Sequence, residues 1–225
     1  MKSLPSSPPS AFGPAHARTY AEGPARQVPG LDGLHRMTGQ LLAERVPAGG
    51  RVLVLGAGGG LELQALAQAH PGWRFDGVDP SAAMLEGARQ RTTAFADRIS
   101  LHHGYVEAAP GGPFDGAVCL LTLHFVAAAQ RCPTLQQLHR RLARGAPLVV
   151  AHLSIPDQAP GLWLDRHLRF GGTGEAQLPA ARQAMLDRLS ILSPARDEAL
   201  LGEAGFGDVS LFYAGLSLRG WVAYA

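Results

Sequence analysis

The sequence of 225 residues has little charge, a single lysine and only two cysteines. Charged residues make up 17% of it, and 20 basic against 18 acidic residues leave a formal net charge of +2, so nothing in the composition requires a nucleic-acid partner. Cys119 and Cys132 show neither the density of a disulfide framework nor the spacing of a metal site, which favours a reducing cytoplasm and no metal. No apolar run reaches the roughly 20 residues of a membrane-spanning helix, so we expect no membrane segment.

The apolar content is sufficient for one folded domain. Hydrophobic residues make up 46% of the 225 residues, which suits one core better than two. Residues 1–15 are rich in serine and proline and lack the apolar stretch of a secretory signal, so we expect a disordered tail there. Residues 16–225 should form a single domain.

Strands and helices alternate along most of this domain. Short apolar runs predict buried strands, and longer segments with apolar residues three and four apart predict amphipathic helices. The expected strands are 51–55, 73–78, 99–103, 114–121 and 147–153, and the expected helices are 30–46, 61–70, 81–93 and 133–144. This alternation predicts a doubly wound, Rossmann-like α/β sheet.

The end of the chain departs from that rhythm. Residues 154–195 contain two further helical segments, 161–170 and 179–192, and we expect them to form a helical cap inserted after the fifth strand. Strands at 209–214 and 218–225 are too close together for a parallel crossover, so they must pair antiparallel. The predicted fold is therefore a seven-stranded α/β sheet with an antiparallel last strand.

A glycine-rich turn, Gly56-Ala57-Gly58-Gly59-Gly60, stands between the first strand and the helix after it. Glycines let a backbone approach a ligand closely, and a helix N-terminus offers free N–H groups. Asp79 ends the second strand, at a position where a carboxylate can accept both hydroxyls of a ribose. The two features together indicate a nucleoside cofactor; a tight structural turn with a helix-capping aspartate is the alternative.

Two kinds of phosphate-binding turn fit the sequence poorly. A dinucleotide turn needs a small residue where this chain has Leu61, and a P-loop needs a lysine, of which the chain has only Lys2. A nicotinamide oxidoreductase is therefore disfavoured, and the terminal hairpin also argues against it.

Four segments together resemble the motifs of class I S-adenosylmethionine-dependent methyltransferases. Val-Leu-Val-Leu-Gly-Ala-Gly-Gly-Gly at 52–60 is similar to the first motif, and Gly-Val-Asp-Pro-Ser at 77–81 to the second. Residues 114–125 and 138–150 resemble the fourth-strand motif and the helix and strand after it. The resemblance implies S-adenosyl-L-methionine as the cofactor and S-adenosyl-L-homocysteine as its product. The expected acid at the third position of the first motif is replaced by Val54.

Within that family, the chain resembles the branch that contains the tRNA uridine carboxymethyl-S-adenosylmethionine synthase, through residues 26–31 and 122–125. The branch has Tyr in place of Leu31 and Asn near Leu120, and its cofactor-binding Arg has only an approximate counterpart at Arg182. The resemblance therefore carries over the fold and the cofactor, without the carboxylated form of the cofactor.

The same resemblance implies a set of cofactor contacts: the turn at the methionine end, Asp79 at the ribose, and residues after the second and third strands at the adenine. The expected cofactor-binding residues are Tyr20, Arg26, Gly56, Ala57, Gly58, Asp79, Pro80, Met84, Tyr105, Val106 and Leu120. Core packing is the alternative role for Met84, and a solvated surface position is the alternative for Arg26.

Methyl transfer needs a nucleophile held against the methyl group, and a dedicated base is optional. If the acceptor must lose a proton, a histidine is the favoured base near neutral pH. His124 after the fourth strand and His152 in the fifth stand near the edge where open α/β sheets bind ligands. We expect His124 to be the better catalytic candidate, and a structural hydrogen bond is the alternative for both.

These observations predict a cytoplasmic enzyme that transfers a methyl group to an O, N or C atom of a small molecule. The alternatives are a tRNA-modification enzyme of the related branch and a non-catalytic S-adenosylmethionine-binding protein. We expect no nucleic-acid or membrane partner, and a homodimer remains open.

Overall fold

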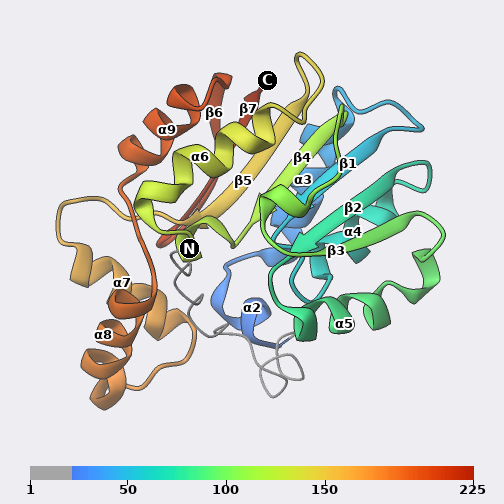
Figure 1. Cartoon of the computed structure of the whole chain (residues 1–225). Coiled ribbons are helices and arrows are strands. Elements are labelled where there is room, and N and C mark those ends of the chain that lie inside the picture. Colours follow the sequence, from blue (N-terminus) through green and yellow to red (C-terminus); the bar gives the residue numbers. More distant parts are fainter. Residues whose placement is uncertain (1–21) are drawn as a thin grey trace, which may run out of the picture.

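The computed structural model describes residues 22–225, and a seven-stranded sheet organises this part of the chain (Figure 1). The strand order is β3-β2-β1-β4-β5-β7-β6. The strands are β1 Arg51–Leu55, β2 Arg74–Asp79, β3 Ile99–His103, β4 Gly116–Leu120, β5 Pro147–Leu153, β6 Gly207–Gly215 and β7 Leu218–Tyr224. Strands β1 to β5 run parallel, and β7 pairs antiparallel with both β5 and β6. The predicted doubly wound sheet with an antiparallel last strand is confirmed.

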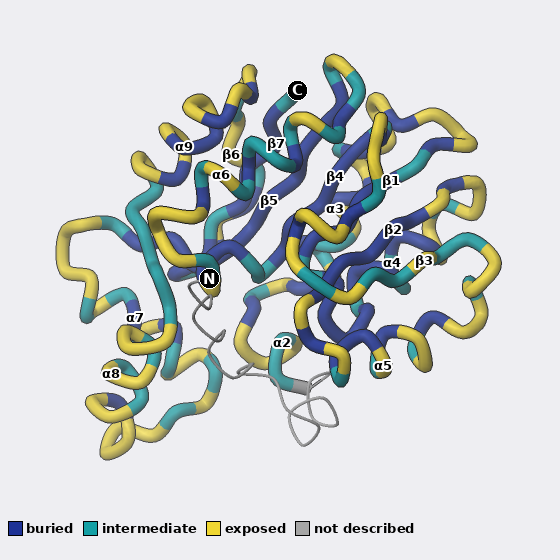
Figure 2. Tube along the Cα trace, in the orientation of Figure 1, coloured by how far each residue is buried: buried dark blue, intermediate teal, exposed yellow. Residues whose placement is uncertain are grey.

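Helices cover both faces of the sheet, which is why its central strands are almost entirely apolar. Apolar residues of α3, α4 and α5 pack on one face, and those of α6 and α9 on the other. Figure 2 shows the buried strands between the two helical layers. The helices are α2 Glu22–Gln27, α3 Leu31–Ala43, α4 Leu61–Ala69, α5 Ala82–Arg91, α6 Ala128–His139, α7 Pro160–Phe170, α8 Leu178–Arg188 and α9 Pro194–Glu203, with short 3₁₀ helices η1 Thr93–Phe95, η2 Val106–Ala108, η3 Leu123–Phe125 and η4 Glu175–Gln177.

The segment after β5 folds into α7 and α8, which pack against each other beside the carboxyl end of β5 (Figure 1). Backbone hydrogen bonds fasten the connection that follows α8 to the sheet. Ile155 donates to the Leu192 carbonyl at 3.0 Å, and Ser190 donates to the His124 carbonyl at 2.9 Å. The role of residues 154–195 as a cap stays a prediction.

Helix α6 begins at Ala128, whereas the sequence predicted a start at Pro133, and that prediction was wrong. Pro133 lies inside the helix, where its ring removes one backbone hydrogen bond. The first turns form nonetheless because Arg131 is fully buried and donates to Asp197 of α9 at 2.7 Å. This tertiary contact outweighs the local preference of proline.

Other helices and strands begin or end a few residues away from the bounds expected from the sequence. Strand β4 stops at Leu120 because Leu121 has a left-handed backbone, with φ of 54°. Helix α9 starts at Pro194, because proline suits the first turn of a helix. The short α2 was not predicted.

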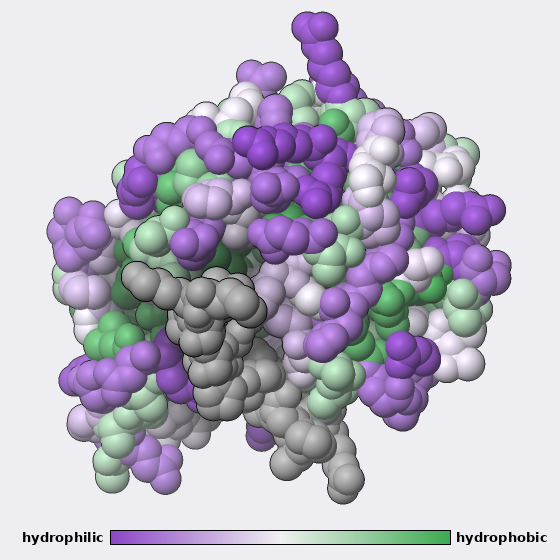
Figure 3. Space-filling model, viewed as in Figure 1, coloured by the Kyte–Doolittle hydropathy of each residue, from purple (hydrophilic) through white to green (hydrophobic). Residues whose placement is uncertain are grey.

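The visible face of the molecule is mostly hydrophilic, with small apolar patches between polar side chains (Figure 3). Of the helices in residues 22–225, none combines the length and the apolar character needed to cross a membrane.

Candidate functional site

A cavity of about 440 Å³ lies at the carboxyl ends of β1, β2 and β4. This is the edge of an open α/β sheet where ligands usually bind, and the volume is in the range of small-molecule sites. The lining residues come from the glycine turn, the segments after β2 and β3, and the segment after β4: Leu55, Gly56, Gly58, Asp79, Pro80, Met84, Tyr105, Val106, Glu107, Leu121, Thr122, Phe125, Val126, Ala127, Gln130 and Thr134.

The glycine turn forms one wall of this cavity. The N–H groups of Gly56 and Ala57 both donate to the carbonyl of Val78 in β2, at 2.8 and 3.0 Å, so the turn is tied to the neighbouring strand. Gly56 has φ of 78°, and a Cβ atom there would overlap the side chain of Thr122. Only glycine allows the first strand and the loop after β4 to come this close.

Asp79 connects the turn to the second strand. Its carboxylate accepts from the Gly58 N–H at 2.9 Å and from the Ser81 N–H at 2.8 Å. Burial raises the pKa of Asp79, although these hydrogen bonds and nearby His103 oppose the shift. Ser81 in turn caps α5 by accepting from the Met84 N–H. One carboxylate therefore shapes the turn and also faces the cavity.

The cavity wall that is formed by the residues following β2 and β3 is apolar. Met84 and Val106 are 2% and 3% exposed, and both line the cavity. The contact of Met84 with the adenine stays a prediction. Tyr105, by contrast, is 62% exposed. His103 holds this side together through a hydrogen bond between its Nε2 and the Pro80 carbonyl at 3.0 Å, which the tautomer with a proton on Nε2 would form.

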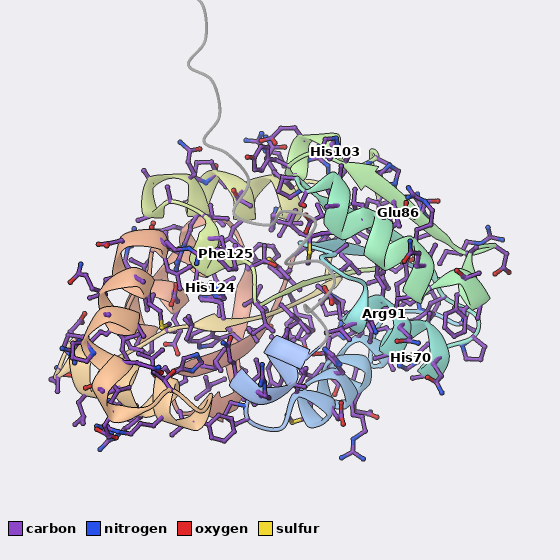
Figure 4. The ribbon with its side chains drawn as sticks, turned by 90° about the horizontal axis from the view of Figure 1, so that it is seen from below. His70, Glu86, Arg91, His103, His124 and Phe125 are labelled. Atoms are coloured by element: carbon purple, nitrogen blue, oxygen red, sulfur yellow. The ribbon has the colours of Figure 1, made fainter. Side chains whose placement is uncertain are left out.

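The loop after β4 supplies the opposite side. Its helix η3 has three residues per turn, so Thr122 and Phe125 lie on one face, and both line the cavity. His124, which stands between them in the chain, is not among the lining residues. Figure 4 shows His124 and Phe125 side by side, with His103 on the β3 side of the molecule. The motif resemblance included this segment, but no sequence signal indicated a role for Thr122 or Phe125.

Neither of the two predicted catalytic histidines lines the cavity. His124 is 5% exposed, and its Nδ1 accepts from the Leu153 N–H at 3.2 Å. Burial, followed by the charges of His152, Arg131 and His167, lowers the pKa of His124 well below 6.5. The structure therefore places His124 inside the core as a neutral acceptor.

His152 belongs to a buried polar cluster on the α6 and α9 side of the sheet. Its Nε2 lies 3.2 Å from Asp197, which also accepts from the guanidinium of Arg131. The guanidinium of Arg131 reaches the carbonyl of Ser190 as well. The catalytic roles of both histidines stay predictions, and the structure does not bring either to the cavity.

The other residues that were expected to bind the cofactor do not line the cavity. Ala57 and Leu120 are buried beside the lining residues without belonging to them, and Arg26 is an exposed residue of α2. Tyr20 lies outside the described residues. Arg182 donates to both carboxylate oxygens of Asp165 at 2.9 Å, which ties α8 to α7. Gly56, Gly58, Asp79, Pro80, Met84, Tyr105 and Val106 do meet around one cavity.

The charge of the cavity is negative. Among the described lining residues, Asp79 and Glu107 are the ionisable acids, and no lysine or arginine belongs to the lining. Such a lining favours a ligand with positive charge and apolar surface.

Comparisons of the sequence with known proteins found a methyltransferase domain and relatives that are named carboxy-S-adenosyl-L-methionine synthases. The model of a methyltransferase domain matches residues 53–148. The carboxy-S-adenosyl-L-methionine synthase of Pseudomonas putida is 28% identical over 219 residues, which cover 92% of this chain and 89% of that protein. The synthase of Campylobacter curvus is also 28% identical, over 124 residues that cover 55% of this chain and 53% of the relative.

Solved structures share the fold. A protein from Nostoc punctiforme PCC 73102 superposes with a TM-score of 0.70 at 21% identity, over 94% of this chain and 59% of that one. Human N-acetylserotonin methyltransferase, solved in complex with S-adenosylmethionine, gives a TM-score of 0.62 at 18% identity, over 97% of this chain and 60% of that one. This chain thus spans about six tenths of the length of these two proteins.

Proposed function

We propose that this chain, a class I S-adenosylmethionine-dependent methyltransferase by its domain, its relatives and its fold, transfers a methyl group to an O, N or C atom of a small molecule. One observation supports the proposal most. The glycine turn, Asp79 and an apolar wall surround one cavity whose lining carries negative charge. A nucleoside with a cationic sulfur matches these features, because its base is apolar, its ribose offers two hydroxyls and its sulfonium is positive.

The residues present fit this cofactor. Gly56 and Gly58 of the turn line the cavity without side chains, Asp79 offers acceptor oxygens for the ribose, and Pro80, Met84 and Val106 supply an apolar wall. When bound, S-adenosylmethionine supplies a methyl group activated by a positive sulfur. Because the reaction is an in-line displacement, the protein contributes mainly by holding the acceptor in position.

The loop after β4 is the proposed place where the acceptor meets the methyl group. Phe125 is 43% exposed and lines the cavity together with Thr122. The Thr122 hydroxyl donates to the Leu120 carbonyl at 2.8 Å, so its oxygen stays available as an acceptor. His124 stays the candidate base from the sequence, although burial separates it from the cavity. A cytoplasmic location and a homodimer likewise stay predictions.

Carboxy-S-adenosylmethionine synthesis is a second candidate, since several relatives have that name. Against it, the described lining offers no arginine or lysine for an added carboxylate, and Arg182 is engaged with Asp165. Mass spectrometry of the nucleosides formed during turnover distinguishes the two products. A tRNA-modifying role predicts tight, strongly salt-dependent binding of tRNA, and we expect none.

Calorimetric titration with S-adenosylmethionine and S-adenosylhomocysteine tests the cofactor assignment. We expect binding by the wild type, and a loss of tenfold or more in affinity for Asp79→Ala. Asp76→Asn is the matched control on the same strand, because Asp76 binds Arg51 and His102 and lies outside the cavity lining. Binding that survives in Asp79→Ala unchanged would remove Asp79 from the site.

A further inference from the structure

Arg131 is a fully buried arginine near the start of α6, with an exposed fraction of 0%. The nitrogen atoms of its guanidinium reach three different segments of the chain. Nη1 donates to Asp197 of α9 at 2.7 Å, Nε donates to the Val126 carbonyl at 3.4 Å, and Nη2 donates to the Ser190 carbonyl. Arg131 therefore joins α9, the loop after β4 and the connection that follows α8.

This division of the guanidinium is not the arrangement that pairs a buried carboxylate best. Arginine and a carboxylate pair most strongly through two parallel hydrogen bonds, one to each oxygen. Here Oδ1 of Asp197 accepts from Arg131, whereas the buried Oδ2 has no hydrogen-bond partner in the part of the chain that the structure describes. The other donors of the guanidinium bind backbone carbonyls instead. The pattern thus favours the connection of segments over the strength of one ion pair.

One of these segments forms a wall of the cofactor cavity. Val126 lines that cavity together with Phe125 and Ala127. The bond from Arg131 to the Val126 carbonyl is long and therefore weak on its own. A second route reinforces it, because the residue whose carbonyl accepts from Nη2 donates its own N–H to the carbonyl of residue 124, at 2.9 Å. Arg131 consequently reaches the same loop from two directions.

His124 fixes this loop to the sheet. Its Nδ1 accepts from the Leu153 N–H of β5 at 3.2 Å. Its ring lies beside that of Phe125, with 4.4 Å between the ring centroids, and Figure 4 shows the two side chains next to each other. The wall is therefore attached to β5 on one side and to Arg131 on the other.

We propose that Arg131 is a positioning residue, which keeps the cavity wall at residues 122–127 in the arrangement that receives the cofactor and the acceptor. This inference rests on the proposed function, because the acceptor is proposed to meet the methyl group at this wall. Arg131 is not a lining residue and acts through Val126 and Ser190, which are both half-buried. Without the guanidinium, their carbonyls lose a donor and must turn to water, and the wall moves with them.

Two substitutions separate this role from simple stabilisation. Asp197→Asn removes the ion pair, but an amide oxygen can still accept from Arg131, which keeps both of its carbonyl partners. Arg131→Lys keeps a positive charge for Asp197 but lacks the planar fork that spans Val126 and Ser190. If Arg131 only stabilises the fold, cofactor affinity follows stability in both variants.

Calorimetry with S-adenosylmethionine and S-adenosylhomocysteine, together with urea unfolding, tests the proposal. We expect both variants to unfold at lower urea than the wild type. Arg131→Lys should bind both ligands about fivefold more weakly or worse, because the binding-competent wall is populated for less of the time, and Asp197→Asn should bind within about twofold of the wild type. Arg196→Lys is the control, since Arg196 pairs with Glu203 on the surface of α9.

A second variant covers the case in which Arg131→Lys does not fold. Arg131→Met combined with Asp197→Leu leaves no unpaired buried charge, so we expect it to fold. It should bind the ligands as weakly as we expect of Arg131→Lys. A folded double variant with wild-type affinity would overturn the positioning role.

Hydrogen exchange gives a readout that needs no ligand. The N–H groups of Phe125 and Val126 donate to the carbonyls of Thr122 and Leu123 at 2.9 and 3.0 Å, so movement of the wall exposes them. We expect exchange within residues 122–127 to be about tenfold faster or more in Arg131→Lys, without such a change in β1.

The outcomes distinguish the two proposals. Equal loss of affinity in Asp197→Asn and Arg131→Lys, or exchange that rises equally in β1 and in residues 122–127, would overturn the positioning role of Arg131. Failure of the wild type to bind either ligand would overturn the proposed cofactor, and the exchange experiment would then decide the role of Arg131 alone.

Discussion

The buried carboxyl group of Glu62 should make the ligand-free protein less stable as the pH rises. Its pKa is about 8 in the folded protein against an ordinary value of 4.5, so the folded state binds more protons between these two values. Stability therefore falls with increasing pH in this window, by up to about 1.36 kcal/mol per pH unit. Integrated from pH 5 to pH 9, the loss amounts to about 3–4 kcal/mol, a large part of a typical total stability.

The substitution Glu62→Gln removes the carboxyl group whose protonation causes this pH dependence of stability. Urea unfolding followed by tryptophan fluorescence at pH 5, 7 and 9 measures the effect, and Trp73 and Trp221 are buried reporters. We expect the difference in unfolding free energy between variant and wild type to grow by about 3–4 kcal/mol in favour of the variant from pH 5 to pH 9. Parallel pH dependences for the two proteins would refute a buried, proton-binding Glu62.

Three further substitutions test other parts of the structure. Arg131→Ala removes the guanidinium that pairs with the buried carboxylate of Asp197 and leaves it only His152 nearby, so urea unfolding should show a loss of about 3–5 kcal/mol. His124→Ala should lower the melting temperature because the Leu153 N–H loses its acceptor, whereas lower turnover at unchanged melting temperature and cofactor affinity would assign His124 a catalytic role. Gly56→Ala should abolish cofactor binding in calorimetry, because its Cβ overlaps Thr122 at a positive φ.

Controls for these variants are available on the same chain. Arg196 and Glu203 form an exposed ion pair on α9, and Arg196→Ala should leave the free energy of unfolding nearly unchanged. An equally small change for Arg131→Ala would contradict the buried character of its ion pair. Wild-type affinity in Gly56→Ala would show that the turn can move away from the loop after β4.

The fold and one half of the site could be predicted from the sequence because they depend on local patterns. Apolar runs that end in glycine mark β1, and the position of Asp79 at the end of β2 follows from the same rhythm. Backbone groups form this half of the site, so residue type and spacing are sufficient to recognise it.

The other half depends on side-chain directions that no spacing reveals. The positive φ of Leu121 and the single turn of η3 turn Thr122 and Phe125 toward the cavity and His124 into the core. The position of His124 after a strand predicted a place at the site, but this position fixes only the edge of the sheet and not the direction of the side chain.

Tertiary contacts account for two further misses. Glu62 has the appearance of an ordinary acid in the first turn of a helix, and only the structure shows its burial. Pro133 resembles a helix start, but the buried contact between Arg131 and Asp197 extends α6 beyond it.

We propose that the glycine turn and Asp79 together bind S-adenosylmethionine. Calorimetric titration of the wild type and of Asp79→Ala tests this site most directly, with circular dichroism to show that both proteins are folded. We expect a Kd in the micromolar range for the wild type and at least tenfold weaker binding for the variant. A folded wild type that binds neither S-adenosylmethionine nor S-adenosylhomocysteine would contradict the proposed function.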